Sequence, residues 1–319
     1  MRATFLLFFL GGLLAMPVQA ASDAQAWLKR MSDGQQRQSF EGTFVYERNG
    51  IFSTHEIWRL VGADGSVRER WLQMDGPRQE VSRVDGVTQC IAGGMAGQRG
   101  SAQLWPARKL DGGDLSTWYD VREVGESRIA GRAATVIGLI PKDKYRYGFE
   151  LHVDQETGLP LKSLLLNDKG QVLERLQFTQ LSTAAPDAAE LQPSQSCQAL
   201  PEAKADTPAV SDWHSEWVPP GFTLNDSYKR RSSVSDDQVV SMDYGDGLAR
   251  FSIFIEPLHG AKVDDARTQL GPTSVVSKRL NTDDGGMMVT VVGEIPSGTA
   301  ERIAMSVRPQ APAQGDSAQ

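Results

Sequence analysis

The stretch Ser39–Val61 constrains the fold most, because it carries the sequence signature of a tight β-hairpin. Asn49-Gly50 lies between two runs rich in β-branched and aromatic residues. Asn-Gly favours a two-residue type I′ turn, which needs positive φ at both central positions and joins antiparallel strands. The turn sets the register of the predicted hairpin: Arg48 with Ile51, Tyr46 with Ser53, Phe44 with His55 and Gly42 with Ile57.

The side chains of this hairpin divide into two faces, because successive residues of a strand point to opposite sides. The apolar face carries Phe40, Phe44, Tyr46, Ile51 and Ile57. The polar face carries Glu41, Thr43, Glu47, Thr54 and Glu56, with Phe52 and Trp58 as exceptions. A hairpin is marginal by itself, so the aromatic face must be covered by the rest of the chain or by a ligand.

Short strand patterns separated by turn residues continue after the hairpin, and their spacing predicts a meandering antiparallel sheet. They are Ser66–Met74, Gln79–Val84, Gly86–Ile91, Val121–Ser127, Ala133–Ile140, Tyr147–Asp154, Pro160–Leu166 and Val172–Leu181. A short helix is predicted over Ser22–Met31, with Ser22 or Asp23 as its cap and Ala24, Trp27, Leu28 and Met31 on one face. Trp27 is interpreted as a core anchor. A second short helix is predicted over Asp114–Tyr119.

The segment Ala92–Gly113 differs from the strands around it, because it is rich in glycine and contains Leu104-Trp105-Pro106. Glycine costs backbone entropy in any regular element. The segment is therefore predicted to be a flap that carries apolar residues, with an ordinary surface loop as the alternative. It is not a phosphate-binding loop, because no Gly-Lys-Ser/Thr or strand–G-x-G-x-x-G–helix context is present.

The composition shifts to Ala, Pro, Ser, Asp and Glu over residues 183–211, which predicts a linker between two domains. Residues 22–182 would form the first domain and 212–308 a smaller one, with a disordered tail over 309–319. The strands predicted for the small domain are Thr223–Arg231, Gln238–Tyr244, Leu248–Glu256, Thr273–Leu280 and Met287–Gly293. Its helix is predicted over Gly298–Val307, capped by Ser297 or Thr299. The fold class is therefore α+β, mostly antiparallel β.

Residues 1–20 have the pattern of a cleaved secretory signal peptide. They contain Arg2, an apolar run over Phe5–Leu14 and Val18-Gln19-Ala20 before Ala21. The alternative is a transmembrane anchor, but the apolar run is too short to span a bilayer. No cysteine follows the cleavage site, which excludes a lipoprotein. An exported protein of the bacterial periplasm is expected.

The net charge limits the classes of partner, and the cysteines relate to the redox state of the compartment. The formal charge is −7, and removal of Arg2 makes it −8, so an acidic chain without a basic block predicts no nucleic-acid partner. Cys90 and Cys197 are the two cysteines. In an oxidising compartment they are expected to form one disulfide, and two separate thiols are the alternative.

The sequence contains none of the common catalytic or metal-binding motifs. G-x-S-x-G, H-E-x-x-H, Cys-x-x-Cys and Walker patterns are absent, and the four histidines lack metal-ligand spacing. His55 and His152 are interpreted as packed or surface residues. The acid pairs Asp236-Asp237, Asp264-Asp265 and Asp283-Asp284 are interpreted as turn residues rather than an acid/base pair. We predict no enzyme activity, no metal and no cofactor.

Two groups of residues suggest binding sites. The first is a candidate lipid-binding surface with inward aromatic residues and the flap: Phe44, Tyr46, Trp71, Leu104 and Trp105. Its alternative is ordinary protein core. The second is a set of cations on predicted strands of the small domain that suits an acidic, apolar peptide: Lys229, Arg230, Arg231, Arg250, Lys278 and Arg279. Its alternative is a solvated face.

Several stretches resemble known proteins. Asp154–Lys162, continued by Leu165, Asp168, Gly170, Glu174 and Phe178, resembles the closing hairpins of Lol-type lipoprotein carriers. The opening Phe40–Tyr46 resembles the RseB/MucB family, and three further stretches do so too: His55-Glu56, then Arg83, Asp85 and Gly86, then Trp217–Phe222. This second resemblance covers nearly the whole mature chain.

The resemblance implies a two-domain periplasmic regulator. The large domain would be a half-open β-barrel with helices across its concave side, and the small domain a mixed sheet with a helix. The family binds the periplasmic part of a membrane-spanning, RseA- or MucA-like anti-sigma factor. It shields that factor from the site-1 protease and so keeps an envelope-stress sigma factor silent, until lipid or lipopolysaccharide releases it.

Two other classes of function remain alternatives at this point. A lipid or lipoprotein carrier would hold an acylated ligand and pass it to a membrane acceptor, although such a carrier needs no second domain. A hydrolase would need a well-placed acid/base pair. The sequence does not decide between a monomer and a homo-oligomer.

Overall fold

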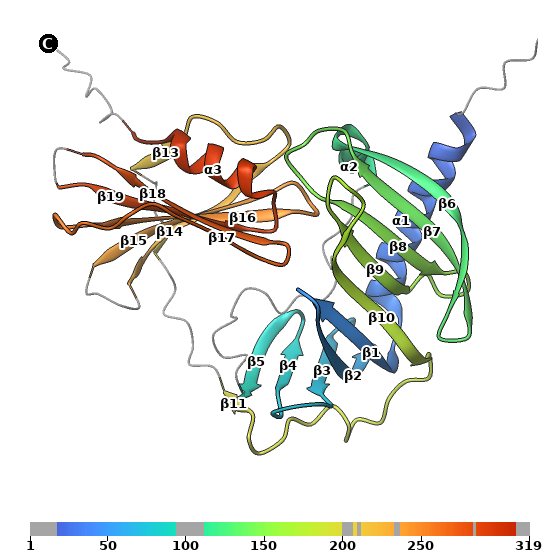
Figure 1. The fold of residues 1–319 in the computed structure, drawn as a ribbon. Helices are drawn as coiled ribbons and strands as arrows, with labels where there is room; N and C mark the ends of the chain where they lie inside the picture. The colour runs from blue at the N-terminus through green and yellow to red at the C-terminus, as the bar shows by residue number, and fades with distance from the viewer. Residues whose placement is uncertain are drawn as a thin grey trace, which may run out of the picture.

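The computed structural model describes residues 18–93, 112–199, 207–208, 212–232, 237–282 and 285–310. These residues form a large and a small β-sheet that lie next to each other, a further two-stranded sheet, and three helices (Figure 1). The α+β class with mostly antiparallel strands is confirmed. The predicted flap with Leu104 and Trp105, most of the signal peptide and the tail beyond residue 310 lie outside the described residues.

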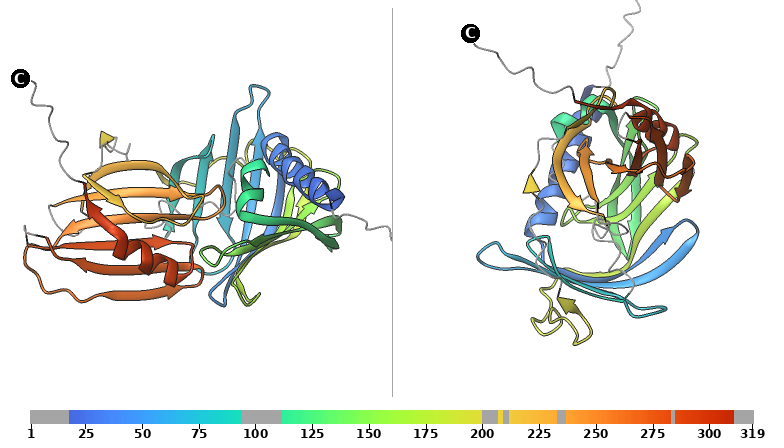
Figure 2. Two further views of the ribbon diagram at one scale, coloured as in Figure 1. Left: turned by 90° about the horizontal axis from the view of Figure 1, so that it is seen from above. Right: turned by 90° about the vertical axis from the view of Figure 1, so that its left-hand side faces the viewer.

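The large sheet contains eleven strands in the order β11-β5-β4-β3-β2-β1-β10-β9-β8-β7-β6, and every pairing is antiparallel. Its strands are β1 (Phe40–Arg48), β2 (Ile51–Val61), β3 (Val67–Gln73), β4 (Glu80–Val84), β5 (Val87–Ala92), β6 (Tyr119–Ile129), β7 (Arg132–Pro141), β8 (Gly148–Asp154), β9 (Pro160–Leu166), β10 (Val172–Ser182) and β11 (Gln198–Ala199). Because β6 and β11 are unpaired edges of a curved sheet, the sheet is an open half-barrel (Figures 1 and 2).

The hairpin predicted from Asn49-Gly50 is confirmed. Both residues have positive φ, 55° and 73°. The four predicted pairs between β1 and β2 occur in the predicted register. The first strand β1 also pairs with the last long strand β10, so this hairpin lies in the middle of the sheet.

Helix α1 (Val18–Arg37) crosses the concave side of the large sheet and is longer at both ends than the predicted Ser22–Met31. Its apolar stripe is as predicted: Ala24, Leu28 and Met31 are buried against β6, β7 and β8, and Trp27 packs against them. The helix continues after Met31 because residues 32–37 contain no proline and only one glycine. A short helix, α2 (Gly112–Trp118), precedes β6.

The small sheet contains seven strands in the order β12-β14-β15-β16-β19-β18-β17. They are β12 (Thr207–Pro208), β14 (Thr223–Arg231), β15 (Gln238–Gly245), β16 (Arg250–Pro257), β17 (Ala266–Leu270), β18 (Thr273–Leu280) and β19 (Met287–Gly293). All its pairings are antiparallel, where the resemblance implied a mixed sheet. Beside it, β13 (Trp213–Ser215) pairs with β20 (Val307–Pro309).

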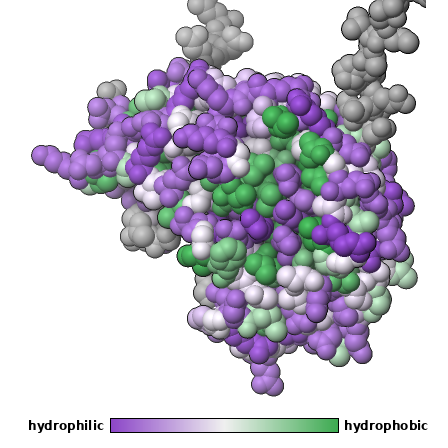
Figure 3. Space-filling model, turned by 45° about the vertical axis from the view of Figure 1, so that its right-hand side comes forward, coloured by the Kyte–Doolittle hydropathy of each residue, from purple (hydrophilic) through white to green (hydrophobic). Residues whose placement is uncertain are grey.

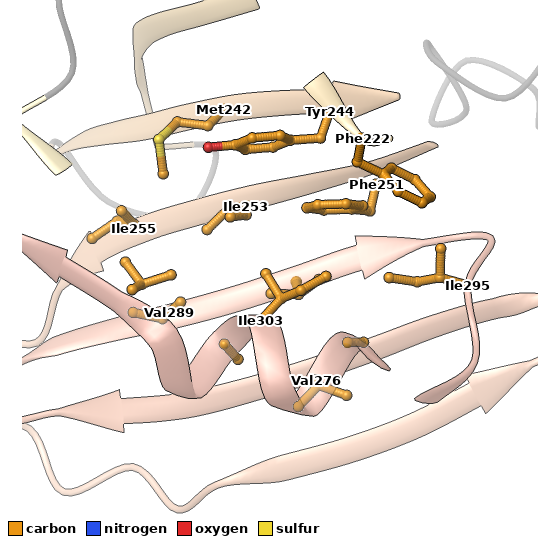
Figure 4. Packing of buried hydrophobic residues seen from close by; sticks show 14 of the residues in the cluster. Phe222, Met242, Tyr244, Phe251, Ile253, Ile255, Val276, Val289, Ile295 and Ile303 are labelled. Carbon is orange, nitrogen blue, oxygen red and sulfur yellow. The ribbon is translucent and has the colours of Figure 1, made fainter. Parts of the chain in front are cut away.

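Helix α3 (Ser297–Ser306) packs on one face of the small sheet and closes its core (Figure 4). The predicted stripe of Ala300, Ile303, Ala304 and Val307 is buried. The aromatic rings of Tyr244 and Phe251 stack in the same core with centroids 5.0 Å apart.

Two details of the small sheet differ from the prediction. The N-cap of α3 is Pro296 and no side chain caps the helix, so neither Ser297 nor Thr299 has the predicted role. Strand β17 was not predicted, because its sequence Ala-Arg-Thr-Gln-Leu is mostly polar and contains a single β-branched residue, Thr268. It forms because β18 offers a free edge beside it.

The first part of the predicted linker is attached to the large sheet. Cys90 on β5 and Cys197 form a disulfide, and β11 pairs with β5. The buried carboxylate of Glu80 accepts hydrogen bonds from the backbone N–H of Ser194 (2.9 Å) and from the Nε–H of Arg70 (2.8 Å). Residues 190–199 therefore form a strap across β3, β4 and β5 rather than a free linker.

Removal of the disulfide is expected to destabilise the large sheet. The bond closes a loop with a sequence separation of 107, and such bonds contribute about 2–4 kcal/mol. The double variant Cys90→Ser/Cys197→Ser should unfold at a lower urea concentration than the oxidised protein. Reduced wild-type protein is the matched control and should unfold together with the variant. Equal midpoints for oxidised protein and variant would contradict this expectation.

Candidate functional site

The aromatic candidates on the concave side of the large sheet lie in its core. Phe44 stacks on His55 with ring centroids 5.1 Å apart, and meets the edges of Phe178 at 5.7 Å and Trp71 at 6.3 Å. Phe44 is 1% exposed and Trp71 is 4% exposed. Both rings therefore pack against protein in this arrangement. A lipid could reach them only if the surrounding side chains moved.

Two polar features mark this cluster. The indole Nε1 of Trp71 is buried and has no hydrogen-bond partner among the described residues, and the Arg83 guanidinium lies 4.5 Å from the centre of the Trp71 ring. Burial lowers the pKa of Arg83 although Glu69 opposes the shift. Tyr46 differs from its neighbours because it is half-buried and its hydroxyl donates a hydrogen bond to Glu174 Oε2 (2.8 Å).

The six candidate cations do not form one patch. Lys229 and Arg231 lie on β14, and β15, β16 and β19 separate that strand from β18, which carries Lys278 and Arg279. Three intervening strands put about 19 Å between the two groups. Lys229 pairs with Asp212 (2.8 Å), and Lys278 pairs with Glu301 (2.9 Å) and Asp265 (3.2 Å).

The remaining two cations have different surroundings. Arg250 begins β16, and its positive charge lowers the pKa of Glu174 in the large sheet, so it lies near the junction of the two sheets. Arg230 lies on β14 between Lys229 and Arg231.

A buried ion pair joins the two sheets. Arg146, in the connection between β7 and β8, lies 2.6 Å from Asp246, in the turn between β15 and β16, and both side chains are fully buried. Asp143 (3.0 Å) and the carbonyl oxygen of Pro220 also accept from Arg146. Burial raises the pKa of Asp246, although the backbone N–H groups of Leu248 and Ala249 and the charge of Arg146 lower it. The ion pair thus fixes the orientation of the two sheets relative to each other, at the cost of removing both charges from water.

Aromatic contacts surround this ion pair. The Arg146 guanidinium lies 5.4 Å from the ring of Trp118 and 5.1 Å from that of Phe222. Trp118 packs on the backbone of Gly221, where a Cβ would lie 2.3 Å from the indole ring. The φ of Gly221 is +88°. Only glycine suits this position, since it combines left-handed backbone with close contact.

A third set of contacts extends the junction to helix α3. Arg302 lies 3.8 Å from the ring centre of Trp217, and its Nη1 donates to the hydroxyl of Tyr145 (3.1 Å). Gln269 on β17 donates to the hydroxyl of Tyr147 (3.0 Å). Sequence reasoning identified none of these contacts. The only local signal is Asp246-Gly247, a dipeptide typical of a hairpin turn, which lies between two of the predicted strands.

One side-chain arrangement has the form of a catalytic relay. Ser127 Oγ on β6 lies 2.7 Å from His152 Nδ1, and His152 Nε2 lies 2.8 Å from Glu150 Oε1, both on β8. A nucleophile, a base and an orienting carboxylate have this connectivity in hydrolases. Burial lowers the pKa of His152 despite its bond to Glu150. The same hydrogen bonds also satisfy three polar groups on the convex side of the sheet.

We expect this arrangement to be structural, so that hydrolysis of ester, glycoside and peptide panels stays at background. The chain has no hydrolase motif around Ser127. The measurement compares wild type with Ser127→Ala on the same panels. Activity that disappears in Ser127→Ala would restore the hydrolase alternative.

The described residues offer neither a metal site nor a membrane-spanning helix. Among them, no group of three His, Cys, Asp or Glu side chains gathers in a way that could hold a metal ion. Within the same ranges, none of the helices combines the length and the apolar character needed to cross a membrane. Figure 3 shows hydrophobic side chains gathered in the middle of one face of the molecule, within a rim of hydrophilic ones.

These features define a protein in which an open half-barrel is joined through a buried ion pair to a smaller sheet with one helix. Comparison with known families agrees over both parts of the chain. The model of the MucB/RseB N-terminal domain matches residues 23–201, and that of the MucB/RseB C-terminal domain matches residues 207–308. The chain belongs to the MucB/RseB family.

Individual relatives support this assignment. The Sigma factor AlgU regulatory protein MucB of Pseudomonas aeruginosa is 64% identical over 98% of this chain and all of its own length. A solved structure of the MucA/MucB complex of that organism matches with a TM-score of 0.82 at 63% identity, covering 91% of this chain and all of the matched chain. A structure described as MucB matches with a TM-score of 0.69 at 61% identity, covering 91% of this chain and 98% of the matched chain.

Proposed function

We propose that this chain binds the periplasmic part of a MucA-like transmembrane anti-sigma factor and shields it from the site-1 protease, which keeps an envelope-stress sigma factor inactive. The observation that carries the proposal is the full-length, 64% identity to a protein named as a sigma factor regulator. At this identity over the whole length, two proteins share the fold. The protein acts in the periplasm, after cleavage of residues 1–20.

The arrangement of the two sheets supports the same proposal. This chain superposes on the MucB structure that contains MucA with a TM-score of 0.82, and on the one described as MucB alone with 0.69. The two matches have nearly equal identity and coverage of this chain. Over the matched chain as a whole, the fold is therefore closer to that of the structure solved with MucA.

The partner is proposed to contact cations of the small sheet, and lipid is proposed to release it through the large sheet. Arg279 is exposed on β18, and Lys229 is half-buried on β14. An acidic partner segment would be attracted to such charges mainly during association. Since Phe44 and Trp71 are core residues here, a lipid that reached them would have to disturb the packing of the large sheet. That disturbance is how it would act on the partner.

Calorimetric titration of the full chain with the periplasmic domain of MucA tests the partner assignment. We expect a saturable complex whose affinity falls with added salt. The variant Lys229→Ala/Arg279→Ala should bind more weakly and depend less on salt, because rim charges contribute mainly through long-range attraction. Lys29→Ala, at an exposed position of helix α1, is the matched control and should bind like wild type. Absence of heat and of complex in gel filtration would refute the proposal.

A further inference from the structure

A further contact between the sheets lies at the tip of the β1–β2 hairpin. Arg48 Nη2 donates a hydrogen bond to Thr273 Oγ1 on β18 and lies 3.7 Å from Glu294, just after β19. The backbone at Gly271 approaches the same tip, so that a Cβ there would lie 3.2 Å from Arg48 Cγ. The hairpin tip therefore contacts the small sheet through a charged side chain and through backbone.

Arg48 is shared between two carboxylates that belong to different sheets. Its Nη1 lies 3.7 Å from Glu174 on β10 of the large sheet, while Nη2 faces Glu294 of the small sheet. The groups that face Glu174 are Tyr46 and Arg48 from β1, Glu294 from the end of β19 and Arg250 from the start of β16. The Glu174 side chain is only 23% exposed.

The ionisation of Glu174 is poised near neutral pH. Burial, and after it the negative charge of Glu294, raises the pKa of Glu174 to about 7. The hydrogen bond from Tyr46 and the charges of Arg48 and Arg250 lower it by less. An ordinary glutamate is ionised at all pH values near neutral. Glu174 instead changes its charge near neutral pH.

We propose that Glu174, Arg48 and Glu294 form a proton-controlled clamp, which holds the small sheet more tightly against the large one in acid than in alkali. When Glu174 is ionised, it competes with Glu294 for Arg48 and repels Glu294 directly. When Glu174 is protonated, the repulsion disappears and Arg48 pairs with Glu294 across the junction. Tyr46 still donates to the carbonyl oxygen of the protonated acid, so the Tyr46 hydroxyl keeps its acceptor in both charge states.

The sign of the pH effect follows from the direction of the shift. Docking raises the proton affinity of Glu174, so a protonated Glu174 favours the docked arrangement. The stabilisation is complete below the usual glutamate pKa, falls as pH rises from there, and is lost above about 7. If docking caused the whole shift, the docking equilibrium would change by at most about 300-fold over this range. The buried Arg146–Asp246 pair keeps the sheets in contact at the high-pH end.

The clamp can be observed in the full chain by distance measurements between two spin labels. Val124→Cys on β6 and Met305→Cys on α3 place labels at exposed positions of the two parts, and the native cysteines are protected in their disulfide. Double electron–electron resonance should give one narrow distance distribution at pH 5.5. At pH 8.5 it should broaden or gain a second component, with a midpoint near pH 7.

Glu174→Gln mimics the protonated acid and should give the narrow distribution at both pH values. Glu156→Gln, at a carboxylate that is 79% exposed on the same sheet, is the matched control and should behave like wild type. A distribution that does not change with pH in the wild type would overturn the proposal, as would an unchanged pH response in Glu174→Gln. The experiment needs no partner, so its outcome is independent of the proposed function.

A carboxyl NMR titration gives a second, direct readout. Glu174 should titrate near pH 7 in the full chain and at lower pH in Glu294→Gln, because the negative charge at position 294 is then absent. If Glu174 titrated at an ordinary glutamate pKa in the wild type, the clamp would have no proton to respond to and the proposal would be wrong.

Discussion

Asp246→Ala is expected to weaken the attachment of the two sheets by at most about 3–5 kcal/mol, the cost of an uncompensated buried charge, because Arg146 keeps Asp143 (3.0 Å) as a second carboxylate partner. The variant keeps the Arg146 guanidinium fully buried but removes the carboxylate 2.6 Å from it. Tyr119, whose hydroxyl lies 3.3 Å from the same carboxylate, also loses its partner. Urea unfolding followed by tryptophan fluorescence reports this directly, since Trp118 lies beside the junction.

Two control variants separate the charge from the turn that Asp246 also stabilises. Asp246 Oδ1 accepts the N–H groups of Leu248 (2.9 Å) and Ala249 (2.7 Å). Asp246→Asn keeps an oxygen for these bonds and should lose less stability than Asp246→Ala. Arg146→Met/Asp246→Leu removes both charges and should recover much of the loss. If Asp246→Ala unfolds with the wild-type midpoint, the ion pair does not hold the sheets together.

Phe44→Glu is expected to unfold the large sheet rather than only remove a ligand contact. Phenylalanine-to-alanine changes in cores cost about 3–5 kcal/mol, and glutamate adds a buried charge without a partner. Phe44 is 1% exposed and touches His55, Trp71 and Phe178. Because whole domains are stable by only about 5–15 kcal/mol, the loss is a large part of the total.

Phe44→Leu is the matched control, because it keeps the site apolar and removes only part of the ring volume. It should remain folded and lose about 1–2 kcal/mol. Circular dichroism and urea midpoints of the two variants show whether Phe44 is a core residue or part of a ligand pocket. A folded Phe44→Glu that had lost only a response to lipid would show that the aromatic cluster is a pocket, contrary to the packing described above.

The parts of the fold that depend on local chemistry could be predicted from the sequence. Asn49-Gly50 determines its turn by backbone preference alone, so the register of β1 and β2 followed correctly. The stripes of α1 and α3 were also predicted, since helical periodicity is a local property. Strand β17 was not, because its pairing with β18 decides its conformation and its own polar sequence does not.

The contacts that join the two sheets could not be predicted, because they connect residues distant in sequence. Arg146 and Asp246 are 100 residues apart, and each alone resembles an ordinary surface residue in a turn. The strap was interpreted as a linker because its composition is polar. The bonds of Ser194 to Glu80, separated by 114 residues, attach it. The aromatic candidates were identified as inward-facing, but only the packing shows that Phe44 and Trp71 are core.

The rate of site-1 proteolysis of the MucA periplasmic domain tests the central claim most directly. Purified full chain, added in excess, should slow that cleavage, and Asp246→Ala should protect less because its sheets are held less firmly. An unrelated protein at the same concentration controls for competition at the protease. The account predicts strong protection by the wild-type chain. Cleavage at the same rate with and without the chain would contradict it.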